Sequence, residues 1–362
     1  MKAFVIGRPY HLFNAINYII ANGIDGDAFI LNEYSSARKD YLAVKEAGIF
    51  HTVYFVEESS LRPKNRLLEI QYAIERGIHP LKIIQKSIQE PMISVETLNN
   101  YTEIYSASPG SFVLSLLKIS NAKYYVIEDG AGTYSGKNFL ANQSFKHRLY
   151  CAVFKSGALN LNVEGVYVYS PEMCRTKLSD NILKLPTISN DRADLMRAYQ
   201  QVFAMENDSY KARFIFLSQR LLGLNITMDL YKFIESVFED AGIENYCYRL
   251  HPAEVKDSLK YSDRFSFPNE MWELLCFNYV NNNKVLITIN SSAAFSPFKL
   301  YNMEPYIVFI YRIVGIQGEE LRITEDIVDS LKKCYSNPSK IFVPNNREEL
   351  ISILSTLSKE RR

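Results

Sequence analysis

The N-terminal sequence alternates two short apolar runs with one segment of helical periodicity. The runs are AFVI (Ala3–Ile6) and AFIL (Ala28–Leu31), and PYHLFNAINYIIA (Pro9–Ala21) lies between them. Two β-rich runs joined by a helix predict a βαβ unit with parallel strands, because the helix carries the chain back across the sheet. The alternation continues with predicted strands at Val53–Val56, Glu103–Ser106, Lys123–Ile127 and Gly165–Tyr169, and with a predicted helix at Ser36–Gly48 that has a Ser start and a Gly stop.

A second α/β series follows a polar, less periodic stretch at 180–191. Its predicted strands are Arg213–Leu217, Tyr246–Leu250, Val285–Ile289 and Tyr306–Phe309, and a helix at Asn345–Lys359 ends the series. We therefore predict an α/β protein of two domains, residues 1–190 and 191–362, with the crossing between the domains at 180–191. Two such domains facing a cleft suit an enzyme that uses a nucleotide, and ligands are expected beyond the carboxyl ends of the strands.

The composition is that of an ordinary globular protein. Of 362 residues, 47% are hydrophobic, and 41 Lys and Arg against 40 Asp and Glu leave a net charge of +1. This balance disfavours a nucleic-acid partner. The five cysteines form no C-x-x-C pair, which fits a reducing compartment. The first apolar stretch is too short for a signal peptide, and no apolar run reaches about 18 residues, so we expect a cytoplasmic protein.

Two acids and a glycine end one of the predicted strands. Glu128, Asp129 and Gly130 directly follow the apolar run Lys123–Ile127. A carboxylate at a strand end can be partly desolvated, which raises its basicity, and glycine lets the backbone turn tightly beside a ligand. An ordinary turn is the alternative interpretation, since Asp-Gly is a frequent turn dipeptide.

Two strand ends in the second half carry groups suited to a phosphate. His251 and Pro252 follow one strand, with Arg249 on the same side of the pleat as His251. Ser291 and Ser292 follow another strand and open a predicted helix. An imidazole can neutralise a departing phosphate, and hydroxyls beside free helix N–H groups can bind one. The alternatives are a histidine satisfied by backbone groups and an ordinary serine cap.

An acid also stands near the start of the helix around Trp272. Glu270 can simply favour the helix dipole there, or its carboxylate can accept hydrogen bonds from a ribose diol. Metal binding finds little support, because the five histidines have no metal-ligand spacing. The D-x-D pair of Asp25 and Asp27 precedes a strand instead of following one, which favours a turn.

Taken together, these motifs resemble those of bacterial sialyltransferases of the lipooligosaccharide and polysialic-acid capsule families. Those families carry an acidic-acidic-Gly motif in the first domain, then His-Pro, then a Ser-Ser or Ser/Thr pair. The corresponding residues here are Glu128-Asp129-Gly130, His251-Pro252 and Ser291-Ser292, with further similarity at Ser218-Gln219 and at Pro268–Glu270. The matches occur in the family order and span the chain to about residue 300.

The resemblance implies a GT-B fold, two Rossmann-like domains facing a cleft, and CMP-sialic acid as the donor. It implies an inverting transfer to a glycan hydroxyl that needs no metal or other cofactor. Glu128 would be the base, with Asp129 as the alternative, and His251 would stabilise or protonate the departing phosphate. The implied donor-binding residues are Ser291 and Ser292 on the phosphate and Glu270 on the ribose, with backbone around His251–Pro252 on the cytosine. We expect Arg249, Ser218 and Gln219 to be donor-binding residues as well.

The chemistry of the proposed donor agrees with so small a set of groups. Sialic acid carries a carboxylate beside its anomeric carbon, so the transition state is cation-like, and one base and one phosphate-stabilising group are sufficient. Two alternatives remain open. One is a GT-B transferase that uses another nucleotide sugar, and the other is a non-catalytic α/β binding module.

The resembling families act on lipid-linked glycans at the inner face of the cytoplasmic membrane. We therefore expect a galactose- or sialic-acid-terminated acceptor of the lipooligosaccharide, capsule or O-antigen type. The C-terminal helix, 345–362, carries Leu350, Ile351, Ile353, Leu354 and Leu357 and ends in a basic cluster, so it could contact an anionic membrane surface. The favoured alternative is that these apolar residues belong to the core. The acceptor, the linkage, polymerisation and a homodimer stay open.

Overall fold

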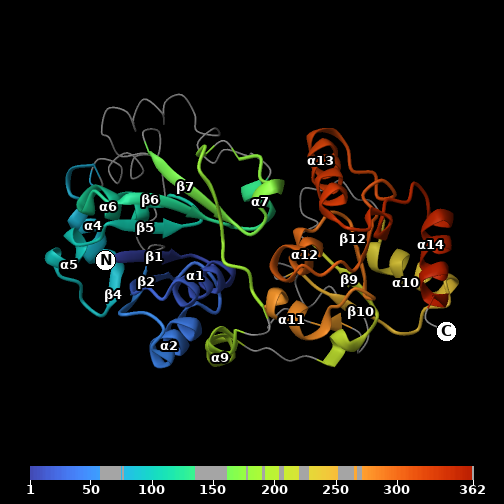
Figure 1. Cartoon of the computed structure of the whole chain (residues 1–362), viewed down its shortest axis with the longest axis horizontal. Helices are drawn as coiled ribbons and strands as arrows, with labels where there is room; N and C mark the ends of the chain where they lie inside the picture. Colours follow the sequence, from blue (N-terminus) through green and yellow to red (C-terminus); the bar gives the residue numbers. More distant parts are fainter. Residues whose placement is uncertain are drawn as a thin grey trace. The chain divides into compact units, whose positions relative to one another are not determined.

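The computed structural model describes residues 1–57, 75, 77–134, 161–176, 178–189, 192–203, 208–219, 228–251, 265–266 and 271–360 (Figure 1). The chain forms two compact units, unit 1 from Met1 to Phe203 and unit 2 from Ala204 to Arg362. Each unit is an α/β structure built on one sheet that is parallel except at one edge strand of unit 1. The predicted α/β architecture is confirmed.

The sheet of unit 1 has the strand order β4-β3-β2-β1-β5-β6-β7-β8. All its pairs are parallel except β3 with β4. The bounds are β1 Lys2–Ile6, β2 Gly26–Leu31, β3 Val53–Val56, β4 Ile88–Glu90, β5 Glu103–Ser106, β6 Lys123–Ile127, β7 Val163–Val168 and β8 Ile182–Lys184. The central strands are buried along nearly their whole length, which is why they appear in the sequence as short apolar runs.

Helices connect the strands of unit 1. They are α1 Pro9–Asn22, α2 Ala37–Ala47, α4 Pro80–Ser87, α5 Val95–Asn99, α6 Ser111–Ser120, α7 Ala131–Tyr134 and α9 Ala193–Val202, with a 3₁₀ turn at Pro171–Met173. Helix α1 has Pro at its first position and a left-handed Gly23 just beyond its end, with φ of 57°. Helix α2 begins after Ser36 and ends before the left-handed Gly48, as its sequence predicts.

The segment that we took as the crossing between domains belongs to unit 1. Residues Ile182–Lys184 form β8, which pairs in parallel with β7, and α9 packs on α1 and α2. The Tyr199 ring of α9 stacks on Phe13 with centroids 4.6 Å apart, and its hydroxyl donates to the Phe13 carbonyl oxygen at 3.1 Å. These contacts hold α9 on the first sheet, so the division falls after Phe203 and not at the predicted 190.

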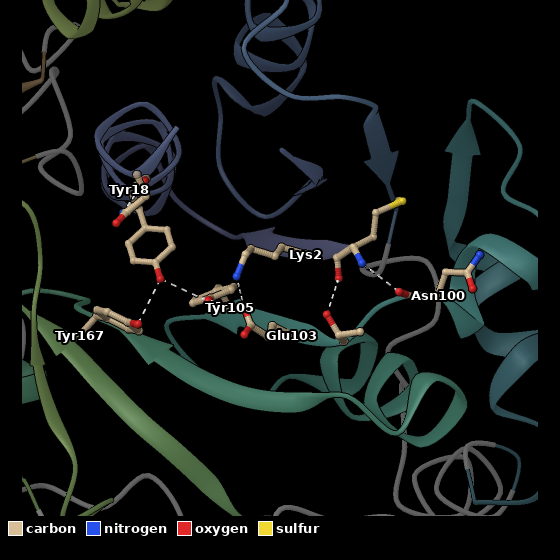
Figure 2. A network of polar contacts seen from close by, with 9 residues as sticks. Lys2, Tyr18, Asn100, Glu103, Tyr105 and Tyr167 are labelled. Atoms are coloured by element: carbon tan, nitrogen blue, oxygen red, sulfur yellow. Dashed lines mark hydrogen bonds and ion pairs between the residues drawn. The ribbon is translucent and has the colours of Figure 1, made fainter. Parts of the chain in front are cut away.

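A tyrosine network fixes α1 above the sheet (Figure 2). The Tyr18 hydroxyl of α1 lies 3.3 Å from the Tyr105 hydroxyl on β5 and donates to the Tyr167 hydroxyl on β7 at 3.0 Å. The Tyr105 hydroxyl donates to Glu103 at 2.7 Å, and Glu103 also pairs with Lys2. The network therefore ties the middle of α1 to β1, β5 and β7, and it sets where the start of the helix lies.

Unit 2 has a sheet with the order β11-β10-β9-β12-β13-β14, in which every pair is parallel. Its strands are β9 Phe214–Leu217, β10 Tyr246–Arg249, β11 Phe265–Ser266, β12 Val285–Thr288, β13 Tyr306–Phe309 and β14 Ile341–Phe342. Its helices are α10 Leu230–Asp240, α11 Trp272–Tyr279, α12 Ser296–Tyr301, α13 Gly318–Cys334 and α14 Arg347–Lys359, with 3₁₀ turns η4 Asp208–Lys211, η6 Ser292–Phe295 and η7 Pro338–Lys340.

The C-terminal helix α14 uses its apolar face inside unit 2. Leu350, Leu354 and Leu357 are buried, and the helix packs against α10. An ion pair between Arg347 and Asp240 adds to this contact. The face that could have met a membrane is therefore largely part of the core. In the described part of the chain, no helix has the length and apolar character needed to cross a bilayer.

Candidate functional site

Both sheets change their direction of strand addition at a central strand. In unit 1, β2 lies on one side of β1 and β5 on the other, and in unit 2, β10 and β12 flank β9 in the same way. Ligands of open α/β sheets bind outside the carboxyl ends of the strands at such a switch point. The loops after β1, β5 and β6 and those after β9, β10 and β12 are therefore where a site is expected.

Glu128 follows β6 and is fully buried. Its Oε1 accepts a hydrogen bond from the Tyr10 hydroxyl at 2.7 Å. Its Oε2 accepts one from the Tyr134 hydroxyl and another from the Tyr169 backbone N–H, the latter at 3.0 Å. Burial, together with the nearby Glu128 carboxylate, raises the pKa of Tyr134 well above its usual value. Both oxygens of the buried acid are thus satisfied by protein donors, as burial of such a group requires.

Asp129 lies one residue further and has a different environment. Its side chain is 36% exposed, and its Oδ1 lies 2.6 Å from Nε2 of His11 and 3.6 Å from the Arg8 guanidinium. The Gly7 backbone N–H donates to Nδ1 of His11 at 3.3 Å. Nε2 therefore carries the ring proton and donates the hydrogen bond to Oδ1 of Asp129. Burial opposes ionisation of Asp129, but the hydrogen bond from His11, the electrostatic interaction with that ring and the positive charge of Arg8 outweigh it, and the pKa of Asp129 is lowered.

Gly130 makes the turn that presents the acid pair. Its φ of 97° is in the region that favours glycine. The Asp129 backbone N–H donates to Oγ1 of Thr133 at 2.9 Å, and the Thr133 N–H donates to the Gly130 carbonyl oxygen at 3.1 Å. The predicted turn at Asp-Gly is confirmed, and it holds Asp129 in place by its backbone.

In unit 2, the ends of β9 and β12 are joined by side chains. Ser218 is buried, and its hydroxyl lies 2.9 Å from the Tyr231 hydroxyl, while its N–H donates to the Arg249 carbonyl oxygen at 2.9 Å. Oε1 of Gln219 accepts a hydrogen bond from the Asn290 N–H at 3.0 Å. Both predicted residues therefore have protein partners and fix the loop after β9.

Ser291 and Ser292 follow β12 and are half-buried. Ser291 caps the 3₁₀ turn η6, since its Oγ accepts a hydrogen bond from the Ala293 N–H at 3.3 Å. Its own N–H donates to Oγ1 of Thr288 at 3.1 Å. Asn290 adds hydrogen bonds to Thr324 and Glu320 at 3.0 and 3.2 Å. The predicted cap is confirmed, and the turn that would meet an anion is held from several directions.

Arg249 ends β10 and lies inside unit 2, not at its surface. Its side chain is 9% exposed in relative area, and its Nη1 donates to the Tyr210 hydroxyl at 2.8 Å. The guanidinium lies 5.5 Å from the Trp272 ring centroid, and Nε1 of Trp272 donates to the Ala293 carbonyl oxygen at 2.7 Å. Arg249 therefore supports the Ser291 turn through Trp272. His251, two residues on, is half-buried.

Some predicted residues cannot be placed. Pro252 and Glu270 lie outside the described residues.

Asp27 of the D-x-D pair is buried and accepts a hydrogen bond from the Tyr101 hydroxyl at 2.5 Å, which suits a structural role. Among the residues that the structure describes, no group of three or more His, Cys, Asp or Glu could hold a metal ion.

Sequence reasoning missed the groups around the acid pair. Arg8, Tyr10 and His11 were not singled out, although they directly follow the first predicted strand. The criterion applied to Glu128, that polar residues after a buried strand face a ligand edge, would have found them. Trp272 and Tyr210 had no such signal, because their contacts with Arg249 arise only in the tertiary structure.

Comparison with known proteins gives the fold. No protein-family profile and no curated protein sequence matches the chain. Among solved structures, the glycotransferase of kitacinnamycin is 12% identical with a TM-score of 0.53, covering 99% of this chain and 90% of that one. Spinosyn rhamnosyltransferase is 10% identical with a TM-score of 0.52, covering 99% and 91%. The chain therefore has the GT-B fold of two Rossmann-like domains.

The same fold likeness extends to epimerases. UDP-GlcNAc 2-epimerase from Methanocaldococcus jannaschii is 12% identical with a TM-score of 0.51, covering 100% of this chain and 94% of that one. Identities this low establish the architecture alone, and two chemistries share it. The activity has to be argued from the site.

Proposed function

We propose that this protein is a glycosyltransferase that moves sialic acid from CMP-sialic acid to a glycan hydroxyl, with inversion and without a metal. One observation carries the proposal. The three motifs that resemble the bacterial sialyltransferases follow buried parallel strands at the ligand edges of the two sheets, β6 in unit 1 and β10 and β12 in unit 2. The named transferases among the solved structures of the same fold support glycosyl transfer at the coarser level.

The donor phosphate would bind at the end of β12. Ser291 and Ser292 stand there at the start of η6, where the Ser291 hydroxyl caps the Ala293 N–H, and hydroxyls at such a start suit an anion. His251 follows β10, which is separated from β12 in the sheet by β9 alone. An imidazole at that edge can stabilise negative charge as CMP departs, which is the role that a divalent cation would otherwise serve.

Arg249 and Gln219 take positioning roles in this proposal. The Arg249 side chain is packed among Tyr210 and Trp272, and Gln219 bonds to the Asn290 backbone. Both residues hold the loops that would meet the donor. Direct donor contact is left to His251, Ser291 and Ser292, and the carboxylate of Glu270 stays the proposed ribose ligand.

The acid pair after β6 would serve the acceptor. A base has to take the proton of the attacking hydroxyl, and this requires a deprotonated carboxylate within hydrogen-bond reach. The resembling families imply a galactose- or sialic-acid-terminated glycan at the inner face of the cytoplasmic membrane, and we extend that acceptor and location to this protein as part of the proposal.

Incubation with a panel of donors tests the proposal. Purified protein would receive CMP-sialic acid, UDP-GlcNAc, UDP-glucose or dTDP-rhamnose, each with an array of galactose- and sialic-acid-terminated acceptors, and products would be weighed by mass spectrometry. We expect sialylated product from the CMP donor alone. Transfer from another donor would support a glycosyltransferase that uses that other sugar. Conversion of UDP-GlcNAc into its epimer, followed by NMR because the two epimers have the same mass, would instead assign the second chemistry of this fold.

Two sets of variants test the roles in unit 2. Loss of Ser291 and Ser292 as a double alanine variant should mainly raise the donor KM, because hydroxyls that hold the ground-state phosphate contribute uniform binding. His251→Ala should lower kcat strongly, because charge develops on the phosphate only in the transition state. CMP binding with no turnover of any donor would favour a binding module and defeat the proposal.

A further inference from the structure

The two acids after β6 differ in whether a carboxylate oxygen is accessible to a substrate. Glu128 is 0% exposed, and its two oxygens accept hydrogen bonds from Tyr10, Tyr134 and the Tyr169 N–H. Asp129 is 36% exposed and has Oδ1 bound by His11. Within the described part of the chain, its Oδ2 accepts no hydrogen bond. An acceptor hydroxyl could reach Oδ2 of Asp129 without breaking any of these contacts, whereas reaching Glu128 requires displacing a bound donor.

We propose that Asp129, and not Glu128, takes the proton of the acceptor hydroxyl, and that His11 is the positioning residue that holds its carboxylate. This inference rests on the proposed glycosyl transfer. Glu128 becomes the buried anchor of the loop. The assignment departs from the one that the family resemblance implies, in which the first acid of the motif is the base.

The step balances with the groups named. The acceptor oxygen forms a bond to the anomeric carbon of the donor, and the bond between that carbon and the phosphate oxygen breaks. The bonding electron pair leaves with CMP, and the proton of the acceptor hydroxyl passes to Oδ2 of Asp129. Nothing is oxidised or reduced. Water can later carry the proton away, because the Asp129 side chain is partly exposed.

His11 is fitted to hold Asp129 and not to be the base itself. Its Nδ1 accepts from the Gly7 N–H and its Nε2 donates to Asp129, so neither ring nitrogen offers a lone pair to a substrate. The ring stands in the first turn of α1, which the tyrosine network ties to the sheet. Its side chain is 12% exposed, so the ring itself is largely shielded from water.

A carboxylate with a lowered pKa is adequate for this reaction. His11 and Arg8 keep Asp129 ionised at neutral pH, with burial acting against them. In a cation-like transition state, the attacking hydroxyl becomes strongly acidic as its bond to carbon forms, so a weak base accepts the proton late in the step. The carboxylate must chiefly be deprotonated and correctly placed, and the contacts of Asp129 provide both.

Isosteric variants of the two acids separate their roles. Asp129→Asn should lower kcat by about 10²–10⁴-fold, the usual worth of a general base, with CMP affinity unchanged by calorimetry because CMP would bind in unit 2. Glu128→Gln should keep a larger share of kcat and lower the melting temperature. Asp25→Asn is the matched control, since Asp25 is an exposed acid of unit 1 that lies before β2, and it should behave as wild type.

The pH profile tests the part played by His11. The described titratable groups that act on Asp129 are His11 and Arg8, both from the start of α1, while the Glu128 carboxylate is turned to its own donors. His11→Ala removes the hydrogen bond that lowers the pKa of Asp129, so the acid limb of kcat/KM should move to higher pH. His11→Gln should move the limb back toward wild type, because the Gln amide can donate from nearly the position of Nε2. A merely structural role would lower the rate with the limb in place.

The outcomes are distinct. A greater kcat loss for Glu128→Gln than for Asp129→Asn, with CMP still bound, overturns the assignment and returns the base to Glu128. An acid limb that His11→Ala leaves unmoved removes the role of His11. Wild-type protein that transfers no sugar from any donor of the panel defeats the proposed function, and the inference falls with it; transfer from another donor leaves the inference testable with that sugar.

Discussion

Removing the Tyr134 hydroxyl should cost far more stability than removing that of Tyr10, although both hydroxyls bind Glu128. Tyr134 is 6% exposed, and its hydroxyl donates to Oε2 and accepts from the Ser170 N–H at 3.2 Å. In Tyr134→Phe, a hydrogen bond to a charged group is lost, worth about 1.5–3 kcal/mol, and a buried N–H loses its acceptor, at about 1–3 kcal/mol. We expect a total of roughly 3–5 kcal/mol.

Tyr10→Phe is the matched control. Tyr10 is half-buried, so water can replace its hydroxyl at Oε1, and the expected cost is about 0.5–1.5 kcal/mol. Calorimetry on the whole chain should show a melting transition lowered by about 10 °C in Tyr134→Phe and by only a few degrees in Tyr10→Phe, at about 2–4 °C per kcal/mol for a unit of this size.

Hydrogen exchange locates the same effect within unit 1. The Tyr169 and Ser170 amides, which bond to Glu128 and Tyr134, should lose protection by about 100-fold or more in Tyr134→Phe, since each 1.4 kcal/mol of opening free energy is tenfold. Equal shifts in the two variants, or a cost below about 1 kcal/mol for Tyr134→Phe, would refute the idea that protein donors alone satisfy Glu128.

The remaining predictions concern unit 2, the metal and the membrane. Lys284→Met should destabilise unit 2 by about 3–5 kcal/mol in urea unfolding, because the buried ammonium donates to the carbonyl oxygens of Tyr210, Lys211 and Ala212, and the variant removes this donor from all three oxygens. Trp272→Phe should keep the ring beside Arg249 but lose the bond to the Ala293 carbonyl oxygen, and it should weaken CMP binding by about 3–10-fold in calorimetry. Transfer should survive EDTA, and complete loss that Mg²⁺ or Mn²⁺ restores would contradict the metal-independent mechanism. Deletion of residues 359–362 should not change flotation with anionic liposomes, because the leucines of α14 are already used against α10; flotation that the deletion abolishes would assign membrane contact to the tail.

The strands were predictable where burial is complete. Val285–Ile289 was expected and β12 spans Val285–Thr288, and Tyr246–Leu250 was expected where β10 spans Tyr246–Arg249. Both strands lie inside a parallel sheet with every residue buried, so their sequences are mostly apolar, with Arg249 and Thr288 only at their last positions. Edge strand β8, Ile182–Lys184, has three residues that are exposed or half-exposed, and such a pattern does not distinguish a strand from a loop.

One long helix was missed although its sequence indicates it. Helix α13, Gly318–Cys334, begins with Glu319 and Glu320 and ends with Lys332 and Lys333, which is the charge order that a helix dipole favours. Its buried residues Thr324, Val328 and Leu331 recur at spacings of four and three. The elements predicted from the sequence include none between the strand at Tyr306–Phe309 and the helix at Asn345–Lys359.

The motifs of the candidate site were visible in the sequence, but the contacts of their residues were not. Strand-end position singled out Glu128, Asp129, His251 and Ser291 from the sequence alone. The partner of Asp129 is His11, 118 residues away in the chain, and only the tertiary structure brings the two together. Arg249 shows the opposite case, because strand alternation put it beside His251, whereas the structure buries its side chain against Tyr210 and Trp272.

The different environments of Glu128 and Asp129 give a physical reason for two adjacent acids at one strand end. Neighbouring residues of an extended segment direct their side chains to opposite sides. Directly after β6, one side is the interior and the other is the solvent edge, so Glu128 is buried and Asp129 is exposed. An acid in the interior position ties the loop to α1 and to the N–H of Tyr169, the residue that follows β7. These contacts fix the backbone that carries Asp129. The position of the Asp129 carboxylate therefore depends on the Glu128 carboxylate, which need not touch the substrate itself.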